Sequence, residues 1–408
     1  MTRRLFLAAP AAYAQTPGRV TREVFLRSPA RGTAVMANAC YTERSGGGMV
    51  SIEHRFSRSD TVDAAYYRYS KDYGRTWSSP VMRSTGEKRP GGMLRRHPRA
   101  AIVDPNSGRF IEFWNEGLLP TDDPLEGMRQ WNIFYKVEGR VRQVIQEGRE
   151  FGPRHPLPGI YTGRNMVMLG DVGSVPMVTT GGSILLPAMA TTLDAAGKLY
   201  NPTGGYTYTD VVVLHGRWRG PRLTWTSSGV VKGDPGRSTR GMDEPTLGTL
   251  SGGRLIMVMR GSNDRNPGLP GYKWVSYSDD GGFRWTAPQP WTYETCAPFF
   301  SPSASSQLLP HSNGKLYWLG HISAANPRGN SPRYPVYLGE VDRTSGLLLR
   351  DSLVLLDDRQ AGEDQILMLY SPYCREDRQT GGIAVHLSRL FAFREGWVGD
   401  AMLYRVKV

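Results

Sequence analysis

The sequence predicts an all-β protein folded as a six-bladed β-propeller with four-stranded antiparallel blades. Three observations support this fold: a composition dominated by turn formers, a glycine turn that recurs along the chain, and an N-terminal strand that can close the ring. The 408 residues include 48 glycines, 29 prolines and 10 tryptophans. This composition is typical of many short strands and turns rather than of helices.

A tight glycine turn between two apolar, strand-like runs recurs six times, at intervals of about 60 to 75 residues. The turns are Gly46-Gly47-Gly48, Asn106-Ser107-Gly108-Arg109, Thr180-Gly181-Gly182, Ser251-Gly252-Gly253-Arg254, Ser312-Asn313-Gly314-Lys315 and Thr380-Gly381-Gly382. Glycine is favoured where a hairpin takes φ above zero. Each turn therefore marks the inner hairpin of one unit. The rest of the period can supply two outer strands, which makes each unit a propeller blade.

The blades are expected near residues 30–80, 95–145, 170–228, 243–290, 300–355 and 366–408. Residues 18–28 form a strand-like segment that could complete the last blade and close the ring, so that one propeller domain spans 18–408. A large β-sandwich or a two-domain β protein is the competing architecture. Neither would predict an even period.

Residues 1–14 resemble an export signal. Arg3 and Arg4 precede a short apolar stretch that ends in Ala12-Tyr13-Ala14, an A-x-A-like cleavage site. This pattern predicts a twin-arginine-type signal and a protein that is exported, to the periplasm or the medium. No later segment approaches the roughly 18 consecutive apolar residues that a membrane-spanning helix needs.

The three cysteines, Cys40, Cys296 and Cys374, lie far apart and lack C-x-x-C spacing. We expect buried thiols, with one disulfide as the alternative. The seven histidines show no metal-ligand spacing, and the glycine-rich stretches are hairpin turns rather than phosphate loops. No metal and no cofactor are therefore expected.

The formal net charge of +13 favours an anionic partner. No block of five or more Lys or Arg occurs, and the arginines are scattered among aromatic residues and turns. This distribution argues against nucleic-acid binding. An acidic polysaccharide remains a candidate partner, and the oligomeric state is left open.

Two segments share the pattern S-x-D-x-G-x-[T/R]-W: Ser70 to Trp77, and Ser278 to Trp285. In such a turn Ser and Asp side chains bond nearby backbone N–H groups, glycine takes the left-handed position, and Trp packs under the hairpin. The pattern resembles the Asp-box, or BNR repeat, of sialidases and related propellers, where it lies in the outer hairpin of a blade, remote from the active site. The chain is thereby identified as an atypical member of the sialidase-like superfamily.

The resemblance implies a set of catalytic residues. Sialidase-like enzymes use a tyrosine nucleophile whose proton is taken by a glutamate, with an aspartate as general acid and base. The segment from Glu244 to Arg260 resembles the one in which that glutamate opens an inner strand and an arginine ends the returning strand. Tyr370 opens blade six, as the tyrosine does in that family. The acid should lie in a blade-one loop, where Asp60 is preferred over Asp63.

The resemblance also implies arginines that hold a substrate carboxylate by charge-assisted hydrogen bonds. The expected substrate-binding residues are Arg31, Arg55, Arg96, Arg260 and Asp171. Arg31 and Arg55 resemble two blade-one arginines of sialidases, whereas Arg96 and Asp171 open the inner strands of blades two and three. Blade five departs from the pattern, because it opens with Phe299-Phe300-Ser301-Pro302-Ser303 where a further arginine is expected.

These residues imply a glycoside hydrolase, exo-sialidase-like, that removes an acidic sugar from a glycan. Two alternatives remain open. In a polysaccharide lyase, His97 and Tyr370 would abstract the C5 proton of a uronic acid and protonate the leaving oxygen. In a carbohydrate-binding propeller the same pocket would bind without turnover. A lyase makes an unsaturated product that absorbs in the near ultraviolet, and a hydrolase does not.

Overall fold

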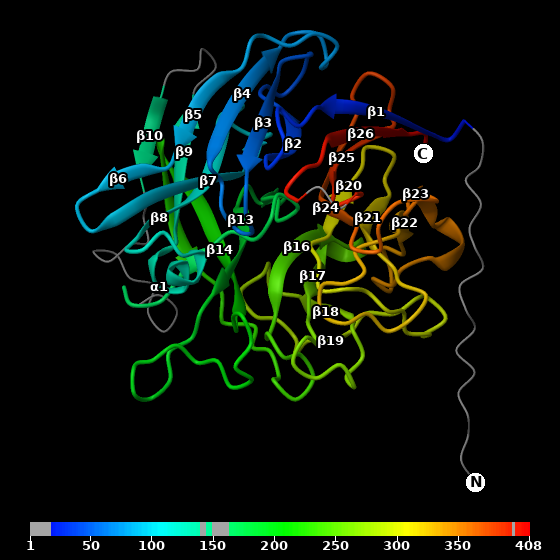
Figure 1. Ribbon diagram of the computed structural model, residues 1–408. Coiled ribbons are helices and arrows are strands. Elements are labelled where there is room, and N and C mark those ends of the chain that lie inside the picture. Colours follow the sequence, from blue (N-terminus) through cyan, green and yellow to red (C-terminus); the bar gives the residue numbers. More distant parts are fainter. Residues whose placement is uncertain (1–17, 139–143, 149–162, 394–395) are drawn as a thin grey trace.

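The computed structural model describes residues 18–138, 144–148, 163–393 and 396–408, and it confirms a six-bladed β-propeller (Figure 1). Six antiparallel sheets follow one another along the chain, and each sheet is one blade. Blade one consists of β2 (Ala34–Tyr41), β3 (Met49–Phe56), β4 (Ala64–Ser70) and β5 (Val81–Thr85). Blade two consists of β6 (Glu87–Arg89), β7 (Gly92–Val103), β8 (Phe110–Leu119), β9 (Asn132–Glu138) and β10 (Val144–Gly148). Blade three consists of β11 (Val167–Met168), β12 (Met177–Val178), β13 (Ile184–Ala190), β14 (Asp210–Arg219) and β15 (Arg222–Ser227). Blades two and three thus each gain a short fifth strand, β6 and β12.

Blades four to six have the predicted four strands. Blade four consists of β16 (Asp243–Thr249), β17 (Leu255–Arg260), β18 (Lys273–Ser278) and β19 (Gln289–Pro290). Blade five consists of β20 (Gln307–Pro310), β21 (Leu316–His321), β22 (Val336–Val341) and β23 (Val354–Asp357). Blade six consists of β24 (Met368–Glu376), β25 (Ile383–Leu390), β26 (Ala401–Val406) and the N-terminal β1 (Val20–Leu26). A short helix, α1 (Gly127–Gln130), follows β8. Within the described ranges no helix is both long and apolar enough to cross a membrane.

The ring closes as the sequence predicted. Strand β1 pairs antiparallel with β26, with Val20 opposite Val406, so the blue start of the described chain lies beside its red end (Figure 1). An ion pair of 2.9 Å between Glu23 and Arg405 crosses this pairing. The export signal predicted for residues 1–14 lies outside the described residues.

The six glycine turns are confirmed as hairpin turns: five join the first two long strands of a blade, and the turn at Thr180-Gly181-Gly182 joins the short β12 to β13. Each turn holds a glycine with positive φ, as at Gly46 (88°) and Gly314 (85°). An L-residue would be strained there. The glycine spacing is therefore the spacing of the blades.

Apolar side chains fill the wedges between successive blades. Ile133 and Leu186 belong to one cluster between blades two and three, and Val258 and Trp318 belong to another between blades four and five. A strand in this architecture is covered on both faces by its neighbours, which explains its continuous apolar runs. The rigid core holds the loops at the ends of the strands in fixed positions.

The two S-x-D-x-G segments form the same turn. Ser70 Oγ accepts from the Gly74 amide at 2.9 Å, and Asp72 accepts from the Thr76 amide at 2.9 Å. The second segment repeats both contacts, from Gly282 to Ser278 and from Arg284 to Asp280. Both turns follow the third strand of a blade, on the outer side away from the inner hairpin.

The three cysteines are free thiols. Cys40 and Cys374 are buried, as expected, and burial raises the pKa of the Cys40 thiol to about 12. The expectation fails for Cys296, which is exposed because it lies in a loop before blade five.

Candidate active site

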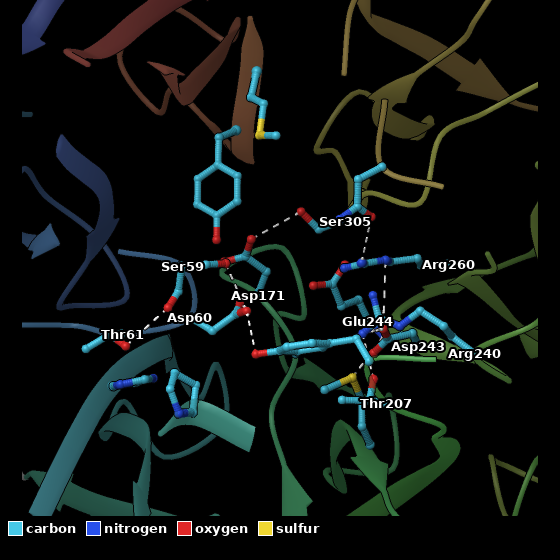
Figure 2. A pocket seen from close by; sticks show the side chains of 18 of the residues that line it. Ser59, Asp60, Thr61, Asp171, Thr207, Arg240, Asp243, Glu244, Arg260 and Ser305 are labelled. Atoms are coloured by element: carbon cyan, nitrogen blue, oxygen red, sulfur yellow. Dashed lines mark hydrogen bonds and ion pairs between the residues drawn. The ribbon is translucent and has the colours of Figure 1, made fainter. Parts of the chain in front are cut away.

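All six blades contribute to one cavity of about 800 Å³, which therefore lies where the blades converge. Each blade supplies at least one ionisable side chain to its wall. These include Asp60, Arg99, Asp171, Glu244, Arg333 and Tyr370, in order of blade. Figure 2 labels Asp60, Asp171 and Glu244 among them. A cavity of this volume lies in the range of small-molecule sites.

Six of the nine predicted site residues line this cavity: Tyr370, Glu244, Asp60, His97, Arg260 and Asp171. The structure does not bring the other three there. Arg31 is exposed in the turn before β2, and Arg55 on β3 lies over the ring of Tyr66, with its guanidinium carbon 4.2 Å from the ring centre. Arg96 forms ion pairs with Glu87 and Glu116 on the opposite side of β7.

The inner strands of three blades are irregular where they reach the cavity. Pairing shifts register between Pro98 and Ala101, between Asp243 and Thr246, and between Tyr370 and Tyr373. Such bulges turn side chains away from the regular alternation and are common beside active sites. In this way they aim Arg99, Glu244 and Ser371 differently from a regular strand.

Backbone strain coincides with the cavity. Asp60, Glu244 and Ser371 have positive φ angles of 53°, 43° and 52°. For residues other than glycine this conformation costs of the order of 1–3 kcal/mol and occurs mostly at functional sites. Two of these three residues line the cavity, and the third, Ser371, bonds to a residue that does.

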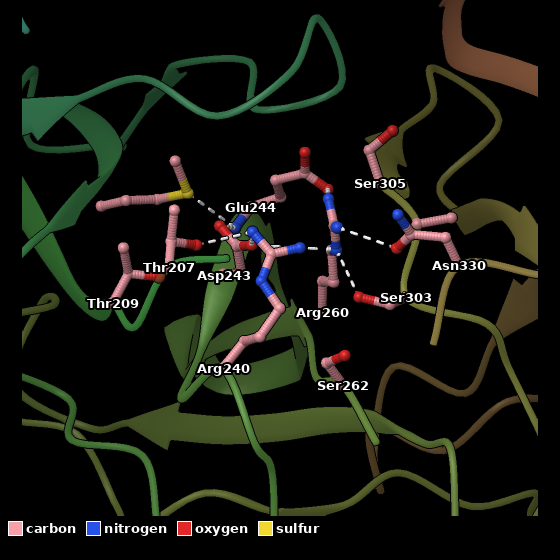
Figure 3. A network of polar contacts seen from close by, with 12 residues as sticks. Thr207, Thr209, Arg240, Asp243, Glu244, Arg260, Ser262, Ser303, Ser305 and Asn330 are labelled. Carbon is pink, nitrogen blue, oxygen red and sulfur yellow. Dashed lines mark hydrogen bonds and ion pairs between the residues drawn. The ribbon is translucent and has the colours of Figure 1, made fainter. Parts of the chain in front are cut away.

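Glu244 and Arg260 form the centre of a polar network (Figure 3). Arg260 Nη1 lies 2.8 Å from Glu244 Oε2, and its remaining nitrogens bond to Ser303 and Asn330. Burial alone would raise the pKa of Glu244, but the charge and hydrogen bond of Arg260, together with the charges of Arg333 and Lys273, outweigh burial and hold that pKa below its ordinary value. Glu244 is therefore an ionised carboxylate at neutral pH.

Arg260 has a further ionic contact with Asp243 of blade four. Its Nε lies 3.8 Å from Asp243, which also pairs with Arg240 at 3.6 Å. On its other side lies β18, where Lys273 is directly opposite Arg260 and fully buried. Lys273 donates to the carbonyl of Ala304, and burial lowers its pKa to about 7. Asp243, Arg260 and Lys273 thus form a row across three strands of blade four, in which Asp243 is bound to Arg240 and Lys273 to the Ala304 carbonyl.

Asp171 lines the cavity together with Glu244 and Tyr370. Its carboxylate accepts from the hydroxyl of Ser371 and, at 3.4 Å, from that of Ser305. Burial raises the pKa of Asp171, and the charge of Glu244 raises it further. Burial likewise raises the pKa of Tyr370, as do the charges of Asp171 and Asp60. The phenol is therefore protonated at neutral pH.

Asp60 lies at the exposed edge of the cavity, where it accepts from the hydroxyl of Tyr206 at 3.0 Å (Figure 2). From the sequence, the long insertions at 117–130, 149–166 and 192–206 are expected to lie over one rim of the propeller and to set specificity. Tyr206 of the last insertion and Met128 of the first line the cavity. These two insertions therefore supply part of the rim. Most of the third one, 149–166, lies outside the described residues.

His97 lines the cavity but its ring is already engaged. Its Nε2 accepts from the Val62 amide at 3.2 Å, and the ring packs on Trp131 with 4.6 Å between centres. Burial lowers the pKa of His97 well below its ordinary value. The imidazole is therefore neutral, and Nε2 has no free lone pair for a substrate proton.

Four arginines that line the cavity were not predicted: Arg99, Arg240, Arg328 and Arg333. Arg99 occupies the β7 bulge, and Arg333 precedes β22 in blade five, although no arginine opens that blade. Neither has a carboxylate within 4.0 Å among the described residues, and the Nε atom of each is buried without a hydrogen-bond partner there. The guanidinium carbon of Arg333 lies 5.4 Å from the centre of the Tyr370 ring. The only sequence signal for them was the general excess of arginine.

One part of the wall is apolar. Six methionines line the cavity, namely Met36, Met128, Met166, Met168, Met189 and Met368. Four of them pack with Trp131 in one cluster. The cavity therefore combines anion-binding cations and ionisable acids with an adaptable apolar surface. The described residues hold no group of three or more His, Cys, Asp or Glu that could bind a metal ion.

Comparison with solved structures identifies similar folds. A protein of unknown function from Dyadobacter fermentans aligns over 96% of this chain and 100% of its own, with a TM-score of 0.64 and 13% identity. The NanB sialidase of Streptococcus pneumoniae aligns over 91% and 68%, with a TM-score of 0.59 and 11% identity. The α-L-arabinanase of Penicillium chrysogenum aligns over 94% and 97%, with a TM-score of 0.53 and 13% identity.

No protein-family model matches the sequence, and no curated protein matches it either. At these identities the structural likeness establishes the fold alone, which is the sialidase-like six-bladed propeller.

Proposed function

We propose that this sialidase-like propeller is a glycoside hydrolase that removes an acidic sugar from a glycan in the central cavity. The observation that carries the proposal is the surroundings of Tyr370 in the cavity: Arg333, which has no carboxylate partner among the described residues, lies over its ring, and the charges of Asp171 and Asp60 raise its pKa. Similar solved structures include a sialidase and an arabinanase, which are carbohydrate-active proteins.

In this mechanism Tyr370 is the nucleophile. Its raised pKa means that a base must take the phenolic proton as the Tyr370 oxygen bonds to the anomeric carbon. Asp171 is suited to this task, because its own raised pKa makes its carboxylate a stronger base than an ordinary aspartate. The neighbouring cation of Arg333 stabilises the negative charge that develops on the phenolic oxygen.

Glu244, which the sequence resemblance implied as the base, supports this step only indirectly in the proposed mechanism. It is paired with Arg260, and its negative charge is one cause of the raised pKa of Asp171. Asp60 is placed to protonate the leaving oxygen, because it lies at the exposed edge where the rest of a glycan would extend. Water then attacks the anomeric carbon of the glycosyl-tyrosine while Asp60 takes up the proton of that water, and Asp171 returns its proton to the Tyr370 oxygen as the bond to the sugar breaks.

Arg333 and Arg99 are the best candidates to hold the carboxylate of the sugar. Both face the cavity, and neither has a carboxylate partner among the described residues. Charge-assisted hydrogen bonds from guanidinium groups recognise a planar carboxylate well. These two residues would take the place of Arg31 and Arg55, which do not line the cavity.

The lyase alternative has less support. It needs a base that can reach the C5 proton, and the Nε2 of His97 is occupied by the Val62 amide. A binding protein without turnover would not require the opposed pKa shifts of Asp171 and Glu244.

A panel of glycans that carry sialic or uronic acids tests the proposal, with reducing ends and near-ultraviolet absorbance both recorded. We expect new reducing ends without an absorbing product. Tyr370→Phe should lower turnover at least about 100-fold and keep the fold by circular dichroism, whereas Tyr277→Phe, outside the cavity, should remain active. An absorbing product, or full activity of Tyr370→Phe, would reject the assignment.

A further inference from the structure

A second cavity, of about 480 Å³, lies between blades one and two. The outer strands β4 and β5 of blade one form one wall, and β7, β8 and β9 of blade two form the other. Strand β7 separates this cavity from the central one. His97 and Arg99 line the central cavity, whereas Arg96 and Pro98 line the second.

Strand pairing gathers an unusual set of side chains on this face of blade two. Pro98 lies opposite Trp114, and Trp114 lies opposite Phe134, so that they form one row across three strands. In the next row on that face Glu112 lies opposite Lys136. The other face of the same strands is apolar and packs against blade three. The second cavity is therefore polar and aromatic where a blade interface is otherwise apolar.

The wall on the blade-two side is held in place by its own contacts. The rings of Trp114 and Phe134 are stacked, with 5.8 Å between centres and 20° between planes. Lys136 pairs with Glu112 at 2.6 Å, and Arg96 pairs with Glu116 at 2.5 Å. Trp114 and Phe134 are partly exposed. A rigid aromatic surface bordered by fixed donors and acceptors suits the apolar C–H face and the hydroxyl groups of a sugar ring.

The blade-one wall adds a cation. Arg83 donates to the hydroxyl of Tyr69 at 2.6 Å and lies 5.0 Å from the centre of the Tyr67 ring. It has no carboxylate within 4.0 Å in the part of the chain that the structure describes. The neighbouring hydroxyl of Ser84 is buried at the cavity wall and has no hydrogen-bond partner there. Within the described residues, this wall thus carries an arginine without a carboxylate partner and a buried hydroxyl without a hydrogen-bond partner.

We propose that this inter-blade cavity is a second binding site, for a saccharide unit that bears a carboxylate. Arg83 binds the carboxylate, Trp114 and Phe134 pack against the ring, and Glu112, Glu116 and Lys136 exchange hydrogen bonds with the hydroxyl groups. The site performs no chemistry. Its role is to hold a glycan by a unit other than the one in the central cavity.

Titration calorimetry with D-glucuronic acid, and with D-glucose as the neutral control, tests the proposal. The measurement is made in an Arg333→Met background, so that binding in the central cavity is weakened. We expect glucuronic acid to bind, glucose to bind at least about tenfold more weakly, and Arg83→Met to reduce glucuronic acid binding by a similar factor. Ser84→Tyr, which fills the cavity without removing a charge, should abolish binding.

The matched control is Arg254→Met, at an exposed arginine outside both cavities. The proposal is overturned if folded Arg83→Met and Ser84→Tyr proteins bind glucuronic acid as the background protein does, or if that protein binds it more weakly than about 10 mM. Equal binding of glucose would overturn the carboxylate assignment. Binding needs no turnover, so an inactive protein that still binds would refute the proposed hydrolase and leave this site standing.

Discussion

The guanidinium of Arg333 lies over the ring of Tyr370, with its carbon 5.4 Å from the ring centre, although the two residues come from different blades. Arg333 is buried, and it donates to the carbonyl of Ser303 at 3.2 Å. A cation at this distance from an aromatic face is attracted to the ring. It also favours negative charge on the phenolic oxygen, so it links substrate binding to the nucleophile.

Arg333→Met should raise KM for a carboxylated substrate by about 10- to 100-fold. The reason is the loss of charge-assisted hydrogen bonds, each worth about 1.5–3 kcal/mol. Steady-state kinetics on the free acid and on its methyl ester would measure the effect. The ester cannot use the charge, so KM for it should change much less, whereas kcat should fall on both substrates because Arg333 also stabilises the phenolic oxygen. An equal rise in KM for both substrates would contradict the role of Arg333 in holding the carboxylate.

Asp171→Asn should lower kcat/KM by about 10²- to 10⁴-fold, because the base that accepts the Tyr370 proton is lost. In the original protein the activity should fall as the pH drops through the pKa of Asp171, since only the carboxylate can accept a proton. Burial and Glu244 raise that pKa. The acid limb of the pH–rate profile should therefore lie above the ordinary aspartate value of about 3.9.

Two results bear on this assignment of Asp171. The exposed residue Asp279 offers the matched control, and Asp279→Asn should leave the profile unchanged. An acid limb that persists unchanged in Asp171→Asn would show that another group controls it.

Arg260→Met should destabilise the fold by about 3–5 kcal/mol, because it leaves the buried Glu244 and Asp243 without their shared cation. Urea unfolding followed by tryptophan fluorescence would measure the change. At the exposed pair of Arg254 and Asp279, Arg254→Met should cost less than about 1 kcal/mol. Equal effects of the two substitutions would mean that the Arg260 network contributes no more than a surface pair.

Lys273→Met should change the stability with a sign that depends on pH. The pKa of Lys273 is about 7 in the folded protein against 10.5 ordinarily, so the folded state binds fewer protons between these values. The cost of burying this amine is therefore fully present below pH 7 and disappears as the pH rises towards 10.5. Methionine avoids that cost but leaves the Ala304 carbonyl without its donor.

We therefore expect Lys273→Met to gain about 1–4 kcal/mol at pH 6 and to lose about 1 kcal/mol at pH 10. Melting temperatures of both proteins across this range would show the crossing. A difference that does not vary with pH would mean that Lys273 keeps an ordinary pKa.

Several site residues could be predicted from the sequence because they follow from strand order. Glu244 opens β16 and Arg260 ends β17, so antiparallel pairing returns one to the other. Tyr370 lies in the corresponding inner strand of blade six. A sequence motif that repeats with the blades is sufficient to place such residues.

Other residues could not be placed in this way. Arg99 faces the cavity because of a bulge in β7, and a bulge leaves no signature in the alternation of apolar and polar residues. Arg333 comes from a loop whose path depends on contacts with the neighbouring blade. Arg31 and Arg55 matched the expected positions in sequence, yet neither side chain lines the cavity.

The sequence by itself determined the number of blades, their inner hairpins and the strand that closes the ring, because these depend on local turn chemistry repeated at a regular interval. Only the tertiary structure decided which arginines have no carboxylate partner, how burial and neighbouring charges displace the pKa values of Asp171 and Glu244, and that a second cavity lies between blades one and two. These properties depend on distances between residues far apart in the chain, and electrostatic energy varies with distance and burial rather than with position in the sequence.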